Sequence, residues 1–319
     1  MATNTTATFT SSGALLAAEQ ADLRYLLTIA DRAGMFQHPV FASGYLGRAD
    51  MSKVVQRPTY GLGANEMAAE TEGTGAAGTT IASGKVSATV AGQLLTRDTT
   101  SLLRNITGDA LSPSELFGQD MAVAASTRFL SMVASAMTSA SGSVGSTGVA
   151  LSAATHFAGV AAYRALGSLG LGGTGAPLAL YHVKQVSDLE SNLFTSAGGQ
   201  LQYGDEARRL AAFSGGIFRG FVNDVPIYGT TKVTDDGTDY TGGLLGAGSI
   251  VWADMLPAVD DPSRQVVLGG EAPDGSILPP MLAEVDRNSQ TGVTTVAGRI
   301  FLGVSYGQEI AIKVISSVA

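Results

Sequence analysis

The most regular apolar pattern of the chain lies in residues 112–139, which read SPSELFGQDMAVAASTRFLSMVASAMTS. Ser112 can cap a helix, Pro113 suits the first helical position, and Glu115 stands where it completes a capping box. After this predicted helix start, apolar residues recur every seven positions and predict one buried stripe along the helix. They are Leu116, Val123, Leu130 and Met137, with Val133 and Ala134 on the same side. The pattern predicts one long helix, which ends at the small, flexible residues 138–148.

A second pattern is a pair of strand-like segments that flank a glycine-rich stretch. Met51–Tyr60 has strand propensity, and apolar and hydroxyl side chains alternate in Lys85–Ala91, which Gln93–Arg97 extends. Gly61–Gly84 carries six glycines and too few large apolar residues to fold against its own chain. We expect the flanking strands to pair as a projecting ribbon, and the stretch between them to lie on a neighbouring molecule.

The remaining segments mix helices and strands without the spacing of βαβ units, which predicts an α+β fold. Helices are expected at Ala14–Ala33, Leu151–Ser168, Ser187–Phe194 and Ala207–Phe213. Strands are expected at Pro177–Lys184, Ser249–Leu256, Val266–Leu268, Met281–Arg287, Val293–Tyr306 and Ile310–Ile315. Gly220–Val233 is predicted to be a hairpin that turns at Asn223-Asp224, with Pro226 on a sheet edge. Phe36–Gly47 is expected to be irregular and to pack outside its own core, and Thr234–Gly243 to be a polar surface loop.

The amino-acid composition indicates a surface that is unusual for a soluble chain. Hydrophobic residues make up 45% and charged residues 14%, with 41 glycines. So few charges imply a surface of small polar residues, or one that is buried between subunits. The net charge of −8 leaves no basic footprint for sequence-specific nucleic-acid binding. Cysteine is absent, which excludes disulfides and thiolate sites, and the lack of a long uncharged apolar run argues against a membrane span.

The candidate chemistry of the chain is weak. Two stretches match the glycine pattern of dinucleotide-binding loops, at Gly73-Gly75-Gly78 and Gly170-Gly172-Gly175, but neither follows a strand and opens a helix. The histidines are isolated from one another, and His156 and His182 are expected to be packing residues. Asp235, Asp236 and Asp239 lack the spacing of a calcium loop and are expected in a solvated turn. The sequence therefore predicts no catalytic, cofactor-binding or metal-binding residues.

Charged residues on and beside the glycine-rich stretch are the candidates for contacts between subunits. Each ion pair would contribute little alone and more in a repeated network. The candidates are Lys53, Arg57, Glu70, Glu72, Lys85 and Arg97.

In the order of these parts, the chain resembles the major capsid proteins of tailed bacteriophages, which have the HK97-like fold. The run YHVKQVSDLESNLF, followed by GGIFRGFVNDVPIYGTT, is also similar to a helix-then-hairpin run of that family. The resemblance implies an N-terminal arm, an extended β-hairpin loop, a long spine helix, and peripheral and axial domains. Its expected boundaries are 1–50 for the arm, 51–99 for the loop, 100–145 for the peripheral domain with the spine helix, 146–265 for the axial domain, 266–305 for peripheral-domain strands and 306–319 for a C-terminal strand.

The function that this resemblance implies is structural, not enzymatic. Such proteins assemble into hexamers and pentamers of an icosahedral head that encloses double-stranded DNA without sequence-specific binding. The implied partners are the chain itself and, further, portal, scaffold or cement proteins, with no membrane and no cofactor. The implied location is the virion capsid, after assembly in the host cytoplasm.

Three alternatives stay open at this point. A shell of the encapsulin type, a bacterial protein compartment, would have the same fold. An α+β enzyme with a Gly-rich substrate loop would form a small oligomer with a polar pocket. A Gly/Thr-rich tail or adhesin protein would be mostly strand, which the long helix at 112–139 argues against.

Overall fold

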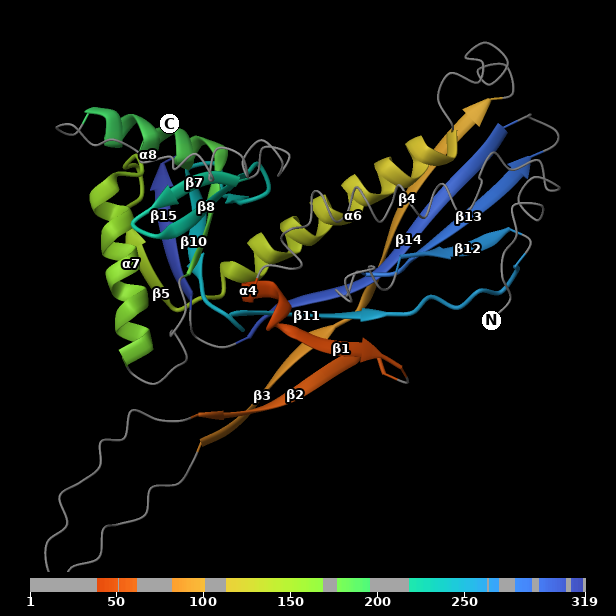
Figure 1. Ribbon diagram of the computed structural model, residues 1–319, viewed down its shortest axis with the longest axis horizontal. Coiled ribbons are helices and arrows are strands. Elements are labelled where there is room, and N and C mark those ends of the chain that lie inside the picture. Colours follow the sequence, from red (N-terminus) through yellow and green to blue (C-terminus); the bar gives the residue numbers. More distant parts are fainter. Residues whose placement is uncertain are drawn as a thin grey trace, which may run out of the picture.

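The computed structural model describes residues 39–50, 52–61, 82–100, 113–168, 177–195, 218–262, 264–269, 279–288, 293–307 and 311–317. Within them, one long helix, α6 (Pro113–Met137), runs from over one β-sheet to the edge of a second (Figure 1). A two-stranded ribbon projects from the first of these sheets. Helices and strands are interspersed along the chain, so the α+β prediction is confirmed. The helices expected at Ala14–Ala33 and Ala207–Phe213 lie outside the described residues.

The first sheet has six strands and is built around β14. Its members are β1 (Tyr45–Ala49), β4 (Ala91–Thr100), β11 (Ile250–Met255), β12 (Gln265–Leu268), β13 (Met281–Asn288) and β14 (Val293–Tyr306). Both β13 and β4 pair with residues 293–300 of β14, so they flank it on opposite sides. Strand β11 pairs with the C-terminal end of β14, and β1 runs parallel to β11. The strands expected at Ser249–Leu256, Val266–Leu268, Met281–Arg287 and Val293–Tyr306 are therefore confirmed, with small shifts at their ends.

The second sheet has seven strands in the order β5-β15-β10-β6-β8-β7, with β9 beside β10. Its members are β5 (Gly142–Gly145), β6 (Leu178–His182), β7 (Phe218–Val222), β8 (Val225–Thr230), β9 (Thr234–Asp235), β10 (Asp239–Leu245) and β15 (Ala311–Ser317). Helices α7 (Ala153–Ser168) and α8 (Val183–Thr195) cover one face of this sheet. The other face joins the core beneath the end of α6.

Strand pairing divides the chain differently from the domain boundaries that the sequence suggested. Strand β5 lies within 100–145 but belongs to the seven-stranded sheet, and β11 lies within 146–265 but belongs to the six-stranded sheet. A hydrophobic pattern shows that a strand is buried, but not which of two sheets buries it.

Helix α6 buries the face that the sequence indicated over its C-terminal half. Leu130, Val133, Ala134 and Met137 are buried, whereas Val123 is only half-buried. The buried stripe of the N-terminal half consists of Phe117, Met121, Ala122, Ala125 and Phe129. A strict seven-residue repeat drifts around a helix of 3.6 residues per turn, which is why the pattern misplaced this half. The side chains of Ser112, Glu115 and Leu116 lie outside the described part of the chain.

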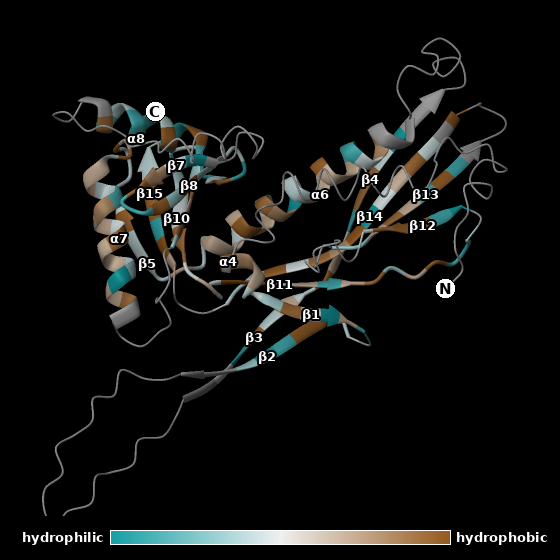
Figure 2. Ribbon diagram, viewed as in Figure 1, coloured by the Kyte–Doolittle hydropathy of each residue, from teal (hydrophilic) through white to brown (hydrophobic). Residues whose placement is uncertain are grey.

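Glycines let α6 pack closely on both sheets. A Cβ at Gly298 of β14 would collide with the sulfur of Met121, and a Cβ at Gly243 of β10 would come within 2.7 Å of the sulfur of Met137. Figure 2 shows hydrophobic residues recurring along β14 and β11, which α6 covers. The helix therefore ties the two sheets to one shared core.

Truncation of Leu130, which is 4% exposed in this core, is expected to destabilise the fold. Leu130→Ala should lower the free energy of unfolding by about 2–5 kcal/mol, because it removes buried apolar area and leaves a cavity. Denaturant unfolding followed by Trp252 fluorescence measures this change. The matched control is Gln119→Ala, an exposed position of the same helix, which should stay within about 0.5 kcal/mol of wild type. Wild-type stability in Leu130→Ala would contradict the packing of α6.

The expectation for Phe36–Gly47 is wrong in its described part. Residues Pro39–Ala42 form the short helix α4, β1 follows it, and Phe41 has no exposed surface. Phe41 packs edge-on against Phe129 of α6, and its carbonyl accepts a hydrogen bond of 2.8 Å from Nε1 of Trp252. A parallel strand pairing and an aromatic contact with distant elements leave no local periodicity, so the sequence pattern could not show them.

The boundary between strand β6 and helix α8 also needs correction. The helix begins at Val183, not at Ser187. Nδ1 of His182 accepts a hydrogen bond from the N–H of Lys184, and the N–H of His182 donates to Oε1 of Gln185. This reciprocal pair is a capping box with histidine and glutamine in place of the usual serine and glutamate. The expected strand at Pro177–Lys184 therefore ends two residues early.

The hairpin of β7 and β8 turns at Asn223 and Asp224 as predicted, since both have positive φ values of 53° and 63°. Pro226 lies on β8, which is an interior strand, but the pairing of β8 with β6 starts only at Ile227. The missing N–H of Pro226 is therefore tolerated without an edge position.

Thr234–Gly243 is not a surface loop throughout. Asp239–Gly243 belongs to β10, in the middle of the seven-stranded sheet, and Asp239 is 4% exposed. Its carboxylate accepts a hydrogen bond of 3.0 Å from the N–H of Gly148. Only Asp235 and Asp236 form the expected exposed turn, in which their carboxylates accept backbone N–H groups of residues 237–239.

Candidate functional site

The feature that stands apart from both sheets is the ribbon of β2 (Val54–Gly61) and β3 (Ala82–Thr89). The two strands pair antiparallel from Val54 opposite Thr89 to Gly61 opposite Ala82. Figure 1 shows the ribbon leading away from the rest of the described chain. The prediction that these segments form a projecting two-stranded ribbon is confirmed.

Only the root of the ribbon is packed on the body of the protein. Ala88 and Val90 are buried in a small cluster with Ala49 and Ala253, against which Val55 also packs. Farther out, Arg57, Pro58 and Lys85 are exposed. Because a two-stranded ribbon is marginally stable alone in water, its outer part needs contacts that the described residues of this subunit do not supply.

A backbone crossing fixes the root of the ribbon. The N–H of Val90 donates to the carbonyl of Lys53 at 2.7 Å, which joins the two ends of the ribbon. Strand β14 passes this point at Gly303, where a Cβ would lie 2.9 Å from the backbone nitrogen of Val90 and closer still to Thr89. Only glycine allows this approach, so the place where the ribbon leaves the sheet is set by backbone and not by adjustable side chains.

The predicted contact residues of the ribbon fall on both of its faces. Lys53 and Arg57 share one face by the two-residue period of a strand, and Lys85 lies opposite Pro58 on the other. Within the described part of the chain, none of these three cations forms an ion pair. Glu70 and Glu72 lie outside the described residues.

Arg97 differs from the other candidates. It lies on β4, not on the ribbon, and its guanidinium binds Asp120 of α6 through contacts of 2.7 and 3.2 Å. Both side chains are well exposed, so this pair contributes little to stability but does hold Arg97 within its own subunit.

A second exposed surface is one face of α7, which sequence reasoning missed. The exposed residues of α7 are spaced three and four apart: Ala154, Phe157, Ala158, Ala161, Arg164 and Ala165. Phe157 is 43% exposed, and Figure 2 draws the helix mostly in hydrophobic colours. The available signal was the single charged residue, Arg164, in a helix of 16 residues, because a solvated helix face normally carries several charges.

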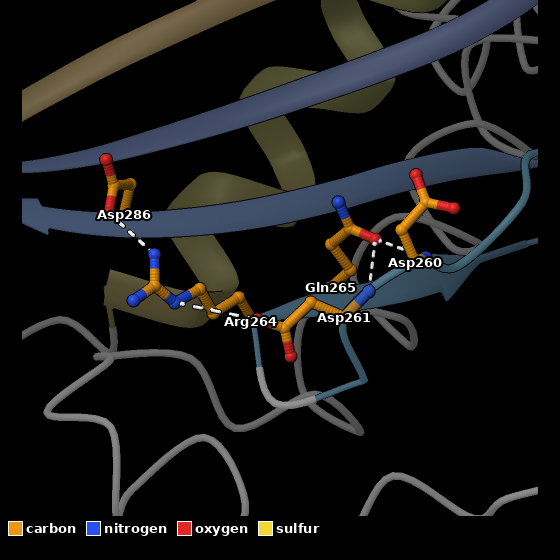
Figure 3. Close-up of polar contacts among 5 residues, drawn as sticks. All are labelled: Asp260, Asp261, Arg264, Gln265 and Asp286. Carbon is orange, nitrogen blue, oxygen red and sulfur yellow. Dashed lines mark hydrogen bonds and ion pairs between the residues drawn. The ribbon is translucent and has the colours of Figure 1, made fainter.

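An acidic surface lies where the chain enters β12 (Figure 3). The guanidinium of Arg264 binds Asp286 at 3.2 Å and Asp261 at 3.7 Å. Oε1 of Gln265 accepts the N–H groups of Asp260 and Asp261 at 2.8 and 3.2 Å, which fixes the turn. Asp261 and Asp286 thus flank one exposed arginine, whereas the carboxylate of Asp260 points away from it, and the arrangement builds no enclosed site.

The described residues carry no enclosed polar site. A cavity of about 220 Å³ lies between α6 and β4, lined mainly by apolar side chains that include Leu95, Met121 and Ile300. At its rim, Nε of Arg128 donates to Oε1 of Gln93 at 2.8 Å. Among the described residues, no group of histidine, cysteine, aspartate or glutamate could hold a metal ion. No described helix has the length and apolar content that a membrane crossing requires.

The two described histidines serve packing, as the sequence predicted. His156 is fully buried beside Tyr181, and His182 stacks on the ring of Tyr240 with centroids 3.7 Å apart while it caps α8. His38 lies outside the described residues.

Comparison with known proteins identifies the fold. No protein-family model and no curated protein matches the sequence. Among solved structures, the chain of the "Capsid of Ralstonia phage GP4" aligns with a TM-score of 0.55 at 9% identity, over 86% of this chain and 85% of that one. The chain from "Mycobacterium phage Che8" aligns with a TM-score of 0.51 at 11% identity, over 88% of this chain and 90% of that one.

These alignments cover nearly the whole length of each partner. The chain therefore has the HK97-like fold of phage capsid proteins. At about one identical residue in ten, the likeness shows the fold and assigns no residue.

Proposed function

We propose that this chain is the major capsid protein of a tailed bacteriophage, a shell subunit that assembles into hexamers and pentamers of an icosahedral head around double-stranded DNA. The HK97-like fold supports the proposal, and the ribbon carries it. The outer part of the ribbon is exposed and rests on no described residue of its own subunit. A neighbouring copy that it covers would supply the missing contacts.

The proposal assigns contacts between subunits to two surfaces, the charged ribbon with its loop and the exposed face of α7. The cations Lys53, Arg57 and Lys85, with Glu70 and Glu72 of the loop, pair with charges of the adjacent subunit. The exposed face of α7 packs against another copy, because an alanine-rich face with an exposed phenylalanine gains little from water. Arg97 has a weaker claim than the others, since Asp120 already binds it.

The proposed domains follow the two sheets. The peripheral domain comprises α6 and the six-stranded sheet, so it includes β11, and the axial domain comprises the seven-stranded sheet with α7 and α8. The arm, loop and C-terminal strand keep the ranges 1–50, 51–99 and 306–319, of which β1 and β4 pair into the six-stranded sheet and β15 into the seven-stranded sheet. The proposed location of the protein is the virion, after assembly in the host cytoplasm. Its further partners are portal, scaffold or cement proteins. This role needs no catalytic residue or cofactor.

Size-exclusion chromatography followed by cryo-electron microscopy of the purified protein tests the proposal. The expected result is closed particles of megadalton mass with icosahedral symmetry. A stable small oligomer with no larger species would contradict it and favour an enzyme.

The contents of particles isolated from the producing cells distinguish a phage capsid from an encapsulin-type compartment. Particles from the producing cells that carry a tail or a DNA-filled interior support the capsid. Tailless particles filled with protein would instead indicate a compartment of the encapsulin type.

A further inference from the structure

His156 occupies an unusual position between α7 and the seven-stranded sheet. It is the fourth residue of α7 and has no exposed surface. Its Nδ1 lies 2.9 Å from the hydroxyl of Tyr181 on β6, which is also fully buried. Its Nε2 is buried and has no hydrogen-bond partner among the described residues. One ring nitrogen is therefore satisfied and the other is sealed from water.

This arrangement suits the neutral ring and not the charged one. A protonated imidazole donates from both nitrogens and needs two acceptors. Tyr181 can accept one of these hydrogen bonds, but Nε2 has no partner within hydrogen-bond geometry among the described residues, and burial of a charge without a partner is strongly unfavourable. The position near the N-terminus of α7 adds the unfavourable positive end of the helix dipole.

No neighbouring charge compensates for this burial. Ion-pairing groups on the elements around α7 are directed elsewhere, as in the pair of Lys184 with Asp188 on α8. The charged residues on α7 and the elements packed against it are Arg164, Lys184, Asp188, Glu190, Arg219, Asp224, Asp239 and Lys313, and within the described chain none forms an ion pair with His156. Burial accordingly lowers the pKa of His156 to about 4, and a polar contact with the backbone of Val222 opposes this shift without cancelling it.

We infer that His156 is an acid-sensitive latch, whose protonation releases α7 from the seven-stranded sheet. The contacts at stake are those of the core beneath α7, which include Val160, Tyr163 and Val314. Release exposes this core and frees the neighbouring end of α8, since Oδ1 of Asn192 accepts the N–H of Ala153 at the start of α7. The inference concerns the subunit itself and does not depend on the proposed function.

The direction of the pH effect follows from linkage. In water the ring takes up a proton near its ordinary pKa of 6.5, but in the packed state only near 4. Between these values the open state binds a proton that the packed state does not, so falling pH favours opening. The packed state of α7 therefore has its full stability against opening above pH 6.5, and this stability is lost progressively as the pH falls toward 4.

Hydrogen exchange of the full-length protein tests the latch. We expect the opening equilibrium of the α7 amides, corrected for intrinsic exchange rates, to rise about 30-fold between pH 7.5 and pH 5. His156→Gln keeps a partner for Tyr181 and cannot take up a proton, so its α7 amides should lose this rise. The matched control is His182→Gln, which changes the cap of α8 and should keep the rise in α7.

The outcomes decide the inference in either direction. An equal acid response in wild type and His156→Gln would overturn it. If His156→Gln does not fold, the wild-type profile decides: opening should rise about tenfold per pH unit near pH 5 and level off below pH 4. A flat profile, or a slope that requires several protons, would overturn the latch.

Discussion

Replacing Arg48 by methionine is expected to lower the free energy of unfolding by about 3–5 kcal/mol, because it leaves a buried carboxylate without its counter-charge. Asp254 on β11 is fully buried, and its two oxygens lie 3.3 Å from Nε and 3.2 Å from Nη2 of Arg48 on β1. Tyr45 donates a third hydrogen bond to it at 3.0 Å. Burial, together with the Asp254 carboxylate, raises the pKa of Tyr45 to about 12, so this hydroxyl keeps its proton at neutral pH.

The partner substitution should be milder, and this asymmetry is the test. In Asp254→Asn no buried charge remains, and Arg48, whose side chain is 39% exposed, can turn to water. We expect a loss of about 1–2 kcal/mol. The double variant Arg48→Met with Asp254→Asn should recover part of the loss caused by Arg48→Met alone.

Guanidinium unfolding followed by tryptophan fluorescence measures all three variants. Trp252 is the single tryptophan of the chain, and its ring lies 4.6 Å from that of Tyr45, so it reports on this junction directly. Equal losses in Arg48→Met and Asp254→Asn would show that the buried charge is not what the junction depends on.

The elements that could be predicted from the sequence are those whose buried residues recur at a regular spacing along a short segment. Helix α6 and the hairpin at Asn223-Asp224 are read from neighbouring residues alone. The ribbon was predictable as well, because alternating strands flank a stretch too poor in apolar residues to bury itself. The helix and the hairpin turn are decided by chemistry within a few positions along the chain, whereas the ribbon joins two segments on either side of the glycine-rich stretch.

Structural features that depend on residues far apart in the sequence, or on unusual residue types, could not be predicted from the sequence. The pairing of β1 with β11 depends on a distant partner that a pattern of polarity does not encode. The cap of α8 is local, but it was missed because His182 and Gln185 are not the usual capping residues. Asp239 appeared to continue an acidic turn, but the N–H of Gly148 makes its burial possible. Among the candidate contact residues, no pattern in the sequence indicated that Asp120 binds Arg97. The face of α7 was overlooked because alanine is a weak hydrophobic signal.

Deletion of Leu62–Ser83 is expected to abolish closed particles while the subunit still folds. The register supports such a shortening, since Pro58 and Lys85 pair directly across the ribbon. After deletion, four residues connect them, and the adjacent Gly61 and Gly84 can adopt the positive φ values of a tight turn. The root of the ribbon, with Ala88, Val90 and Gly303, is unchanged.

The expected loss is large because the same contact recurs at every subunit of a shell. Ordering a glycine-rich segment opposes assembly by roughly 1–2 kcal/mol per residue in backbone entropy, so under the proposed function the contacts of the loop with a neighbour have to exceed this cost. Without the loop, each subunit lacks the proposed contact with the adjacent subunit, within and between the hexamers and pentamers. Circular dichroism and Trp252 fluorescence should match wild type, whereas size-exclusion chromatography and electron microscopy should show only subunits or open fragments. Normal closed shells from the deleted protein would refute the role of the ribbon in assembly.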